Sequence, residues 1–255
     1  MLRPGFWIVL LGVLAAGSAL RAQPASAPAA CPPFGDYAIP DEPLSHVAAV
    51  LAAGGTLNVL AIGSATTVGV SASMVHGTAP GGSYPYRMAD ALQAARPHLQ
   101  LGLTVRGGRG MTAESMLPLL RQALKAQRYQ LVLWQTSTVE AVHGDSPDAM
   151  QSALEDGAEQ VLDSGADLVL VDSQFSRFLR ANVDLDPYQS ALQQVAAMPG
   201  VVVFRRFDLM RDWAHEGQLD LERAGRVDRP REIARLNTCL GQALARFVLN
   251  GAAQK

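Results

Sequence analysis

The sequence predicts an α/β protein with a five-stranded parallel sheet between two layers of helices, a three-layer, doubly wound sandwich. Short apolar runs typical of buried strands recur along the chain, and segments with helical periodicity separate them. Each run is continuous rather than alternating, as expected for strands that helices cover on both faces. The alternation of strands and helices favours right-handed crossovers and one doubly wound sheet.

The expected strands are Leu57 to Ile62, Leu101 to Val105, Leu131 to Trp134, Leu168 to Val171 and Val201 to Phe204. The expected helices are Tyr84 to Ala95, Thr112 to Ala126, Pro147 to Leu162, Pro187 to Ala197 and Glu232 to Leu249, with Thr112 as an N-cap. Ligands of such sheets bind outside the carboxyl ends of the strands. The loops after Ile62, Val105, Trp134, Asp172 and Phe204 are therefore the places to look for a site.

The composition is that of an ordinary globular protein, since 49% of the 255 residues are hydrophobic and 17% are charged. The 21 basic and 23 acidic residues give a formal charge of -2. Without a basic excess to neutralise phosphates, nucleic acid is not expected as a partner. A small or neutral ligand is the better expectation, and a protein partner stays unknown.

The first residues are typical of a secretory signal, with Arg3 near the start, an apolar run from Phe6 to Leu20, and a small cleavage residue at Ala22. The run of about fifteen residues is shorter than the roughly 20 of a spanning helix, although a retained membrane anchor is an alternative. We expect residues 1–22 as the signal, 23–45 as a flexible leader and 46–255 as one domain, exported to the periplasm or secreted. No transmembrane segment is expected after cleavage, which would leave 233 residues with 19 basic and 23 acidic groups, a net charge of -4.

Both cysteines, Cys31 and Cys239, would remain after cleavage. Two thiols in an exported domain tend to pair, so we predict a Cys31–Cys239 disulfide. Two buried free thiols are the alternative, and a lipid-modified Cys31 is weaker because residues 23–30 separate it from the apolar run.

Four segments carry recognisable motifs in the loops. They are Gly63-Ser64-Ala65-Thr66-Thr67-Val68-Gly69, Arg106-Gly107-Gly108-Arg109-Gly110-Met111-Thr112, Trp134-Gln135-Thr136-Ser137-Thr138-Val139-Glu140 and Asp228-Arg229-Pro230-Arg231. In order and spacing they resemble the four blocks of the SGNH (GDSL) hydrolase superfamily, secreted or periplasmic esterases and acyl hydrolases with a flavodoxin-like fold. The resemblance extends from about Leu57 to Leu249, and the stretch Arg206-Phe207-Asp208-Leu209-Met210-Arg211 adds to it.

The resemblance implies a Ser nucleophile, Gly and Asn donors for the oxyanion, and an Asp and His pair near the C-terminus. Gly110 matches the glycine and Asp228 matches the acid, but the nucleophile position falls on Ala65, the Asn position on Val139 and the base position on Arg231. Alanine has no hydroxyl, and a guanidinium stays protonated and cannot act as a base. Losing one oxyanion donor costs about 3 kcal/mol of transition-state stabilisation in comparable sites. The usual mechanism is therefore not expected, and Asp228 should form an ion pair with Arg231.

A relocated pair, Ser64 as nucleophile with His215 as base, is the alternative that would keep activity. His76 and His143 are other candidate bases, although solvated loop histidines explain them better.

Residues that could bind a ligand lie beside the blocks. The side chains at strand ends, Trp134, Gln135, Gln174 and Phe175, could stack on or hydrogen-bond a sugar or acyl group, or could only close the core. Arg106 and Arg109 could hold an anion beside Gly110, or could balance Glu114 and Glu140 at the surface. Thr66 joins Arg109, Gln135 and Gln174 as the expected ligand contacts. No histidine spacing indicates a metal site, and no cofactor is expected.

Three hypotheses follow from the sequence. The first is an SGNH-fold protein of the periplasm that has lost catalysis and binds an acylated glycan or a similar small ligand. The second is an active ester hydrolase with a relocated nucleophile, and the third is a structural or interaction component of an envelope complex. If the block assignment is right, Ala65, Gly110, Val139 and Arg231 should converge in one cleft.

Overall fold

The computed structural model describes residues 30–69 and 82–254. Its strands are β1 (Thr56–Gly63), β2 (Gln100–Gly107), β3 (Leu131–Gln135), β4 (Asp167–Val171) and β5 (Val201–Phe204). They form one parallel sheet in the order β2-β1-β3-β4-β5. The predicted fold class is confirmed. The chain passes from β1 to β2 on one side and then returns to β3 on the other side of β1, so the order of the strands reverses between β1 and β3.

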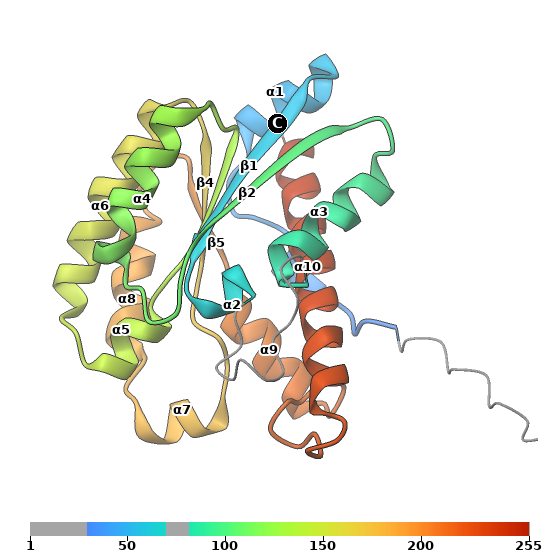
Figure 1. Cartoon of the computed structure of the whole chain (residues 1–255), viewed down its shortest axis with the longest axis vertical. Coiled ribbons are helices and arrows are strands. Elements are labelled where there is room, and N and C mark those ends of the chain that lie inside the picture. The colour runs from blue at the N-terminus through green and yellow to red at the C-terminus, as the bar shows by residue number, and fades with distance from the viewer. Residues whose placement is uncertain (1–29, 70–81, 255) are drawn as a thin grey trace, which may run out of the picture.

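Helices cover both faces of the sheet (Figure 1). On one face α10 (Arg229–Ala253) packs against α3 (Tyr84–Ala95) and α1 (Ser45–Ala53). On the other face α6 (Pro147–Asp163) packs against α4 (Ala113–Ala126) and α8 (Asp186–Val195). Thr112 caps α4 as predicted, because its side chain accepts a hydrogen bond from the Ser115 amide.

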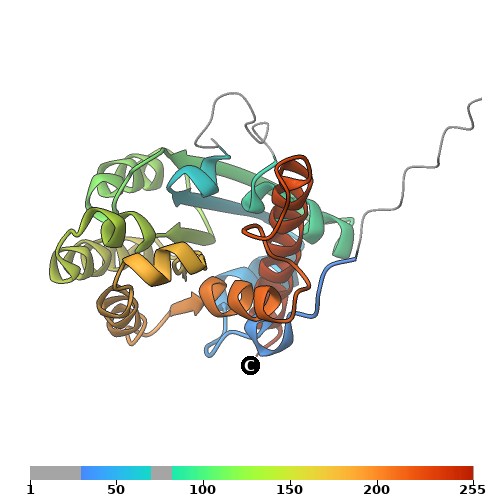
Figure 2. The same cartoon turned by 90° about the horizontal axis from the view of Figure 1, so that it is seen from below.

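Short helices gather at the carboxyl ends of the strands, at the end of the molecule seen in Figure 2. They are α2 (Ala65–Val68), α5 (Thr138–His143), α7 (Arg177–Asn182) and α9 (Arg206–His215). The sequence expectation lacked α2, α5 and α7, and also α1 and the short 3-10 helix η1 (Gly35–Ala38). Four to nine residues are too few to display a helical apolar period, which explains the difference.

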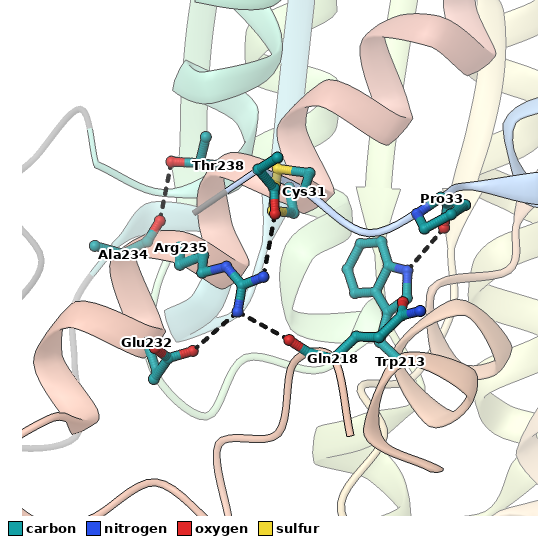
Figure 3. The surroundings of a disulfide bond; sticks show 10 residues. Cys31, Pro33, Trp213, Gln218, Glu232, Ala234, Arg235 and Thr238 are labelled. Carbon is teal, nitrogen blue, oxygen red and sulfur yellow. Dashed lines mark hydrogen bonds and ion pairs between the residues drawn. A yellow bond between two sulfur atoms is a disulfide. The ribbon is translucent and has the colours of Figure 1, made fainter. Parts of the chain in front are cut away.

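The described part of the expected leader is held against the domain rather than flexible (Figure 3). The predicted disulfide is present, and it joins Cys31 to Cys239 of α10 across 208 positions of sequence. The Pro33 carbonyl accepts a hydrogen bond of 2.9 Å from the indole of Trp213, and the Ala30 carbonyl accepts one of 3.1 Å from Arg235. Leu44 is buried in the core. The expected signal, residues 1–22, lies outside the described residues.

Trp134 belongs to the core and not to the ligand-facing edge of the sheet. Its side chain is fully buried, so the expectation that it could stack on a sugar is wrong. Gly157 of α6 lies directly against the indole ring, and a Cβ at position 157 would overlap two of its carbons. The third strand and α6 can approach this closely only because residue 157 has no side chain.

We expect Gly157→Ala to lower the free energy of unfolding by about 1–3 kcal/mol, because the added methyl group overpacks the indole and outweighs the higher helix propensity of alanine. The midpoint of urea unfolding measures the change. Ser152→Ala, at an exposed position of the same helix, is the matched control and should be neutral or slightly stabilising. A Gly157→Ala protein as stable as the control would contradict the proposed contact.

Candidate functional site

The loops that follow β1 and β2 lie close together at the carboxyl end of the sheet. The Gly63 carbonyl accepts a hydrogen bond of 3.2 Å from the Gly108 amide. Gly107 has a φ of 118°, and a Cβ there would collide with the Gly63 carbonyl. A residue without a side chain is therefore required for the second block to reach the first.

The side chain of Gln135 fastens the end of β3 to the turn between β1 and α2. Its Oε1 accepts hydrogen bonds from the Ser64 amide (3.0 Å), the Ser64 hydroxyl (2.8 Å) and the Thr67 hydroxyl (3.1 Å), with a longer one from Thr66 (3.4 Å). Gln135 and Ser64 are both buried. This connection spans the reversal of strand order, which is where sheets of this topology bind ligands.

A small pocket of about 180 Å³ lies directly beside this connection. Ala65, Gly110 and Val139 line it together, as the block assignment requires. All four expected ligand contacts line it as well: Thr66, Arg109, Gln135 and Gln174. The Gln135 Nε2 group donates no hydrogen bond to another described residue, so it remains available as a donor at this pocket.

Ser137 positions the third block at this pocket. It adopts a left-handed conformation with φ of 70°, which is uncommon for a residue other than glycine. Its hydroxyl lies 2.8 Å from the Ser173 hydroxyl and donates to the Thr136 carbonyl at 2.7 Å. These contacts hold the start of α5, which carries Val139 into the pocket wall.

Arg231 does not join the other three block positions, so that expectation is wrong. Its side chain is 74% exposed in the first turn of α10, and it lines neither this pocket nor the neighbouring cavity described below. The predicted ion pair with Asp228 is present at 3.5 Å, but Asp228 is 58% exposed. An exposed pair of this kind contributes at most about 1 kcal/mol, and no buried acid needs compensation here.

The alternative pair of Ser64 and His215 is not brought together. The Ser64 hydroxyl already donates to Gln135, and His215 is an exposed residue at the end of α9 whose ring packs edge-on against Phe175 at 5.9 Å. His143 is 50% exposed and lies 3.7 Å from Asp145. Among the histidines of residues 30–69 and 82–254, none lines the pocket or the neighbouring cavity. His76 lies outside the described residues.

Comparisons with known proteins identify the family. The model of the Non-GDSL lipase-like family matches residues 30–254. The chain belongs to this family. No curated protein matches the chain in sequence.

Solved structures share the fold of this Non-GDSL lipase-like protein at low sequence identity. A two-domain esterase active on acetylated mannans has a TM-score of 0.63 at 15% identity, over 86% of this chain and 57% of that one. A hydrolase from the metagenome of Lake Arreo, Spain, has a TM-score of 0.56 at 16% identity, over 75% and 98%. A variant of a Geobacillus acetyl-xylooligosaccharide esterase has a TM-score of 0.56 at 16% identity, over 71% and 91%.

A larger cavity of about 490 Å³ adjoins the small pocket in this Non-GDSL lipase-like protein, since Ala65, Thr66 and Gln174 line both. Most of its other walls are apolar and come from α9, α10 and the segment around Phe175. Arg206, the first residue of α9, is the buried charged residue of its wall. The site of this family member is therefore a small pocket with several polar residues in its wall, beside a larger and largely apolar cavity.

Arg206 and Asp172 form the buried charged part of the site, which the sequence reasoning missed. Arg206 NH2 donates to the Asp172 carbonyl at 2.6 Å, and NH1 donates to the Thr66 hydroxyl at 3.4 Å. The Asp172 carboxylate accepts a hydrogen bond of 2.8 Å from the Phe207 amide. Burial raises the pKa of Asp172 to about 7 and lowers the pKa of Arg206. The sequence signal was the second of two arginines that follow a buried strand, within a stretch noted only as part of the resemblance.

Glu140 is also buried, so the idea that it balances surface arginines is wrong. Its Oε1 accepts hydrogen bonds from the Ala113 amide (2.6 Å) and the Thr136 hydroxyl (2.9 Å). It therefore satisfies a free amide in the first turn of α4 and ties the third block to that helix. Arg109 is exposed and lines the small pocket.

The described residues carry no indication of a metal centre or a membrane span. Within residues 30–69 and 82–254, no three His, Cys, Asp or Glu side chains cluster as metal ligands would. No helix of the same residues has the length and apolar character needed to cross a bilayer.

The buried carboxyl of Asp172 should make stability depend on pH. The folded protein keeps this proton up to a pKa of about 7, whereas the unfolded chain loses it near the ordinary value of 3.8. The free energy of unfolding should therefore fall as pH rises from about 4 to about 7, by up to about 4 kcal/mol from this group. Asp172→Asn cannot ionise, so its stability relative to the wild type should increase across this range, as urea unfolding at pH 5 and pH 8 will measure.

Asp163→Asn, which removes an exposed carboxyl at the end of α6, is the control for the general effect of losing one charge. Parallel pH profiles of Asp172→Asn and the wild type would contradict the assignment.

Proposed function

We propose that this member of the Non-GDSL lipase-like family is a periplasmic ligand-binding protein that has lost the Ser-His hydrolysis of esters. Its ligand is an acylated glycan or a similar small molecule, bound in the cleft formed by the small pocket and the larger cavity. One observation carries the proposal. The pocket wall presents the methyl group of Ala65 where the block assignment places the nucleophile, and Gly110 and Val139 stand beside it.

The chemistry of the neighbouring groups supports the loss of hydrolysis. A nucleophilic serine needs a base within hydrogen-bond reach and a free path to the substrate carbonyl. The Ser64 hydroxyl instead donates to Gln135 at 2.8 Å. The base position carries Arg231, which is exposed to solvent and paired with Asp228.

Binding is supported by what the cleft retains. The available Nε2 of Gln135 and the polar residues Thr66 and Gln174 can hydrogen-bond a ligand at the pocket, beside a cavity of about 490 Å³. A cavity of this size is typical of small-molecule sites. Two of the similar structures are esterases of acetylated carbohydrates, which supports a ligand of this class. The disulfide supports an oxidising compartment such as the periplasm.

Ester hydrolysis tests the proposal. With p-nitrophenyl acetate and p-nitrophenyl butyrate, we expect the turnover of the purified wild type to equal that of a Ser64→Ala, Thr66→Ala double variant, because neither hydroxyl is activated by a base. A fluorophosphonate probe should label no serine, as peptide mass spectrometry will show. An active esterase assayed in parallel controls for the substrates.

The opposite results would reject the proposal. Turnover that exceeds the double variant, together with a label on Ser64 or Thr66, would establish the hydrolase with a relocated nucleophile.

A further inference from the structure

Arg206 is a buried cation that forms no close ion pair in the described protein, although the Asp172 carboxyl lies near enough to interact with it electrostatically. Its side chain is 1% exposed, and no Asp or Glu of residues 30–69 and 82–254 lies within ion-pair distance of its guanidinium. Its Nε is buried without a hydrogen-bond partner. Burying a charge without a close ion pair and with an unsatisfied donor is unfavourable, and an anion bound at the cavity would compensate this cost.

The guanidinium lies at the large cavity. NH2 is occupied by the Asp172 carbonyl, whereas NH1 has only a long hydrogen bond of 3.4 Å to Thr66, whose side chain lines the same cavity. The Arg206 guanidinium also lies 6.0 Å from the ring centroid of Tyr84, another wall residue. NH1 is therefore the donor best placed to meet a ligand.

The rest of the wall selects an apolar chain. Phe175, Met210 and Leu221 line the cavity from one side, and Ile233 and Leu236 of α10 line it from the other. Such walls favour hydrocarbon over a sugar, which would lose hydrogen bonds with water. Within the proposed ligand class they therefore favour a small amphiphile over a glycan in the large cavity.

Among the described residues, the other charged groups of the cavity wall leave a positive balance around Arg206. Glu222 lines the wall, but its carboxylate already accepts hydrogen bonds from the Ser176 hydroxyl and from the amides of Arg177 and Phe178. Asp172 is not a wall residue of the cavity, and burial raises the pKa of its carboxyl to about 7, so it offsets the charge of Arg206 only in part. Arg229, an exposed wall residue, adds a second positive charge. The cavity thus favours an anion over a neutral or cationic head group.

We propose that Arg206 is the carboxylate-binding residue of the large cavity, and that the ligand is a small amphiphile with a carboxylate on an apolar chain. The inference rests on the proposed function, because it names the ligand class for the same cleft. The guanidinium donates charge-assisted hydrogen bonds to the carboxylate, and α9 and α10 enclose the chain.

Calorimetric titration with octanoate tests the inference, with octanol as the neutral ligand of equal chain length and glucuronate as the carboxylate without a chain. We expect the wild type to bind octanoate at least 10-fold more tightly than octanol or glucuronate. Arg206→Met should lose this preference, so that octanoate binds at least 10-fold more weakly while octanol binding changes little. Arg206→Lys, which keeps the charge but not the planar fork, should be intermediate.

Arg223→Met is the matched control, since Arg223 is an exposed arginine outside the cavity wall, and it should bind octanoate like the wild type. Circular dichroism and thermal unfolding verify that each variant folds. If Arg206→Met does not fold, the wild-type comparison of octanoate with octanol still decides, and Ile233→Trp, which fills the cavity from α10, should abolish octanoate binding.

Equal binding of octanoate and octanol to the wild type would overturn the inference, and so would unchanged octanoate binding by a folded Arg206→Met protein. Preference for glucuronate over octanoate would also overturn it. These outcomes are separate from those of the proposed function. A wild type that hydrolyses p-nitrophenyl esters yet binds octanoate through Arg206 would refute the proposed function and retain the carboxylate site.

Discussion

The organisation of the site depends on one amide oxygen, that of Gln135 at the end of the third strand. Ser64 donates to it through both its amide and its hydroxyl, and Thr67 donates from the next turn of chain. The Gln135 oxygen lies where the strand order reverses, and all of these donors come from the turn between β1 and α2. Their hydrogen bonds therefore fix this turn relative to β3. The same bonds consume the serine hydroxyl. The connection that shapes the pocket therefore also fixes the direction in which the Ser64 hydroxyl donates.

The charged groups of the C-terminal block and those of the cleft differ in burial. Asp228 and Arg231 of the block are exposed to solvent and interact weakly, whereas Arg206 and Asp172, outside the four blocks, are buried at the cleft. The electrostatic interactions that burial strengthens therefore lie beside the cavity and not at the C-terminal block. The proposed ligand binding rests on this arrangement.

The fold was predictable because short stretches of sequence are sufficient to indicate its strands and helices. Continuous apolar runs gave all five strands, and Thr112 marked a helix start through its side-chain chemistry. The positions of Ala65, Gly110 and Val139 followed from motif spacing, since all three come directly after strands of one parallel sheet. The position of Arg231 could not be predicted in this way. It depends on how α10 packs against the rest of the domain, which motif spacing does not determine. The burial of Arg206, Glu140 and Trp134 could not be predicted from the sequence either, because it depends on which residues of distant segments cover these side chains.

The disulfide covalently attaches one wall of the cavity to the N-terminal segment of the chain. Cys239 lies on α10 between Leu236 and Leu240, two residues of the cavity wall. Its partner Cys31 belongs to the N-terminal arm, the described residues 30–45 of the expected leader. A chain that folds among reduced thiols would leave this wall attached only by packing and by the hydrogen bonds of the arm. The disulfide therefore adds one covalent attachment to a wall that is otherwise held by packing and hydrogen bonds. Whether this attachment forms depends on the redox conditions in which the chain folds.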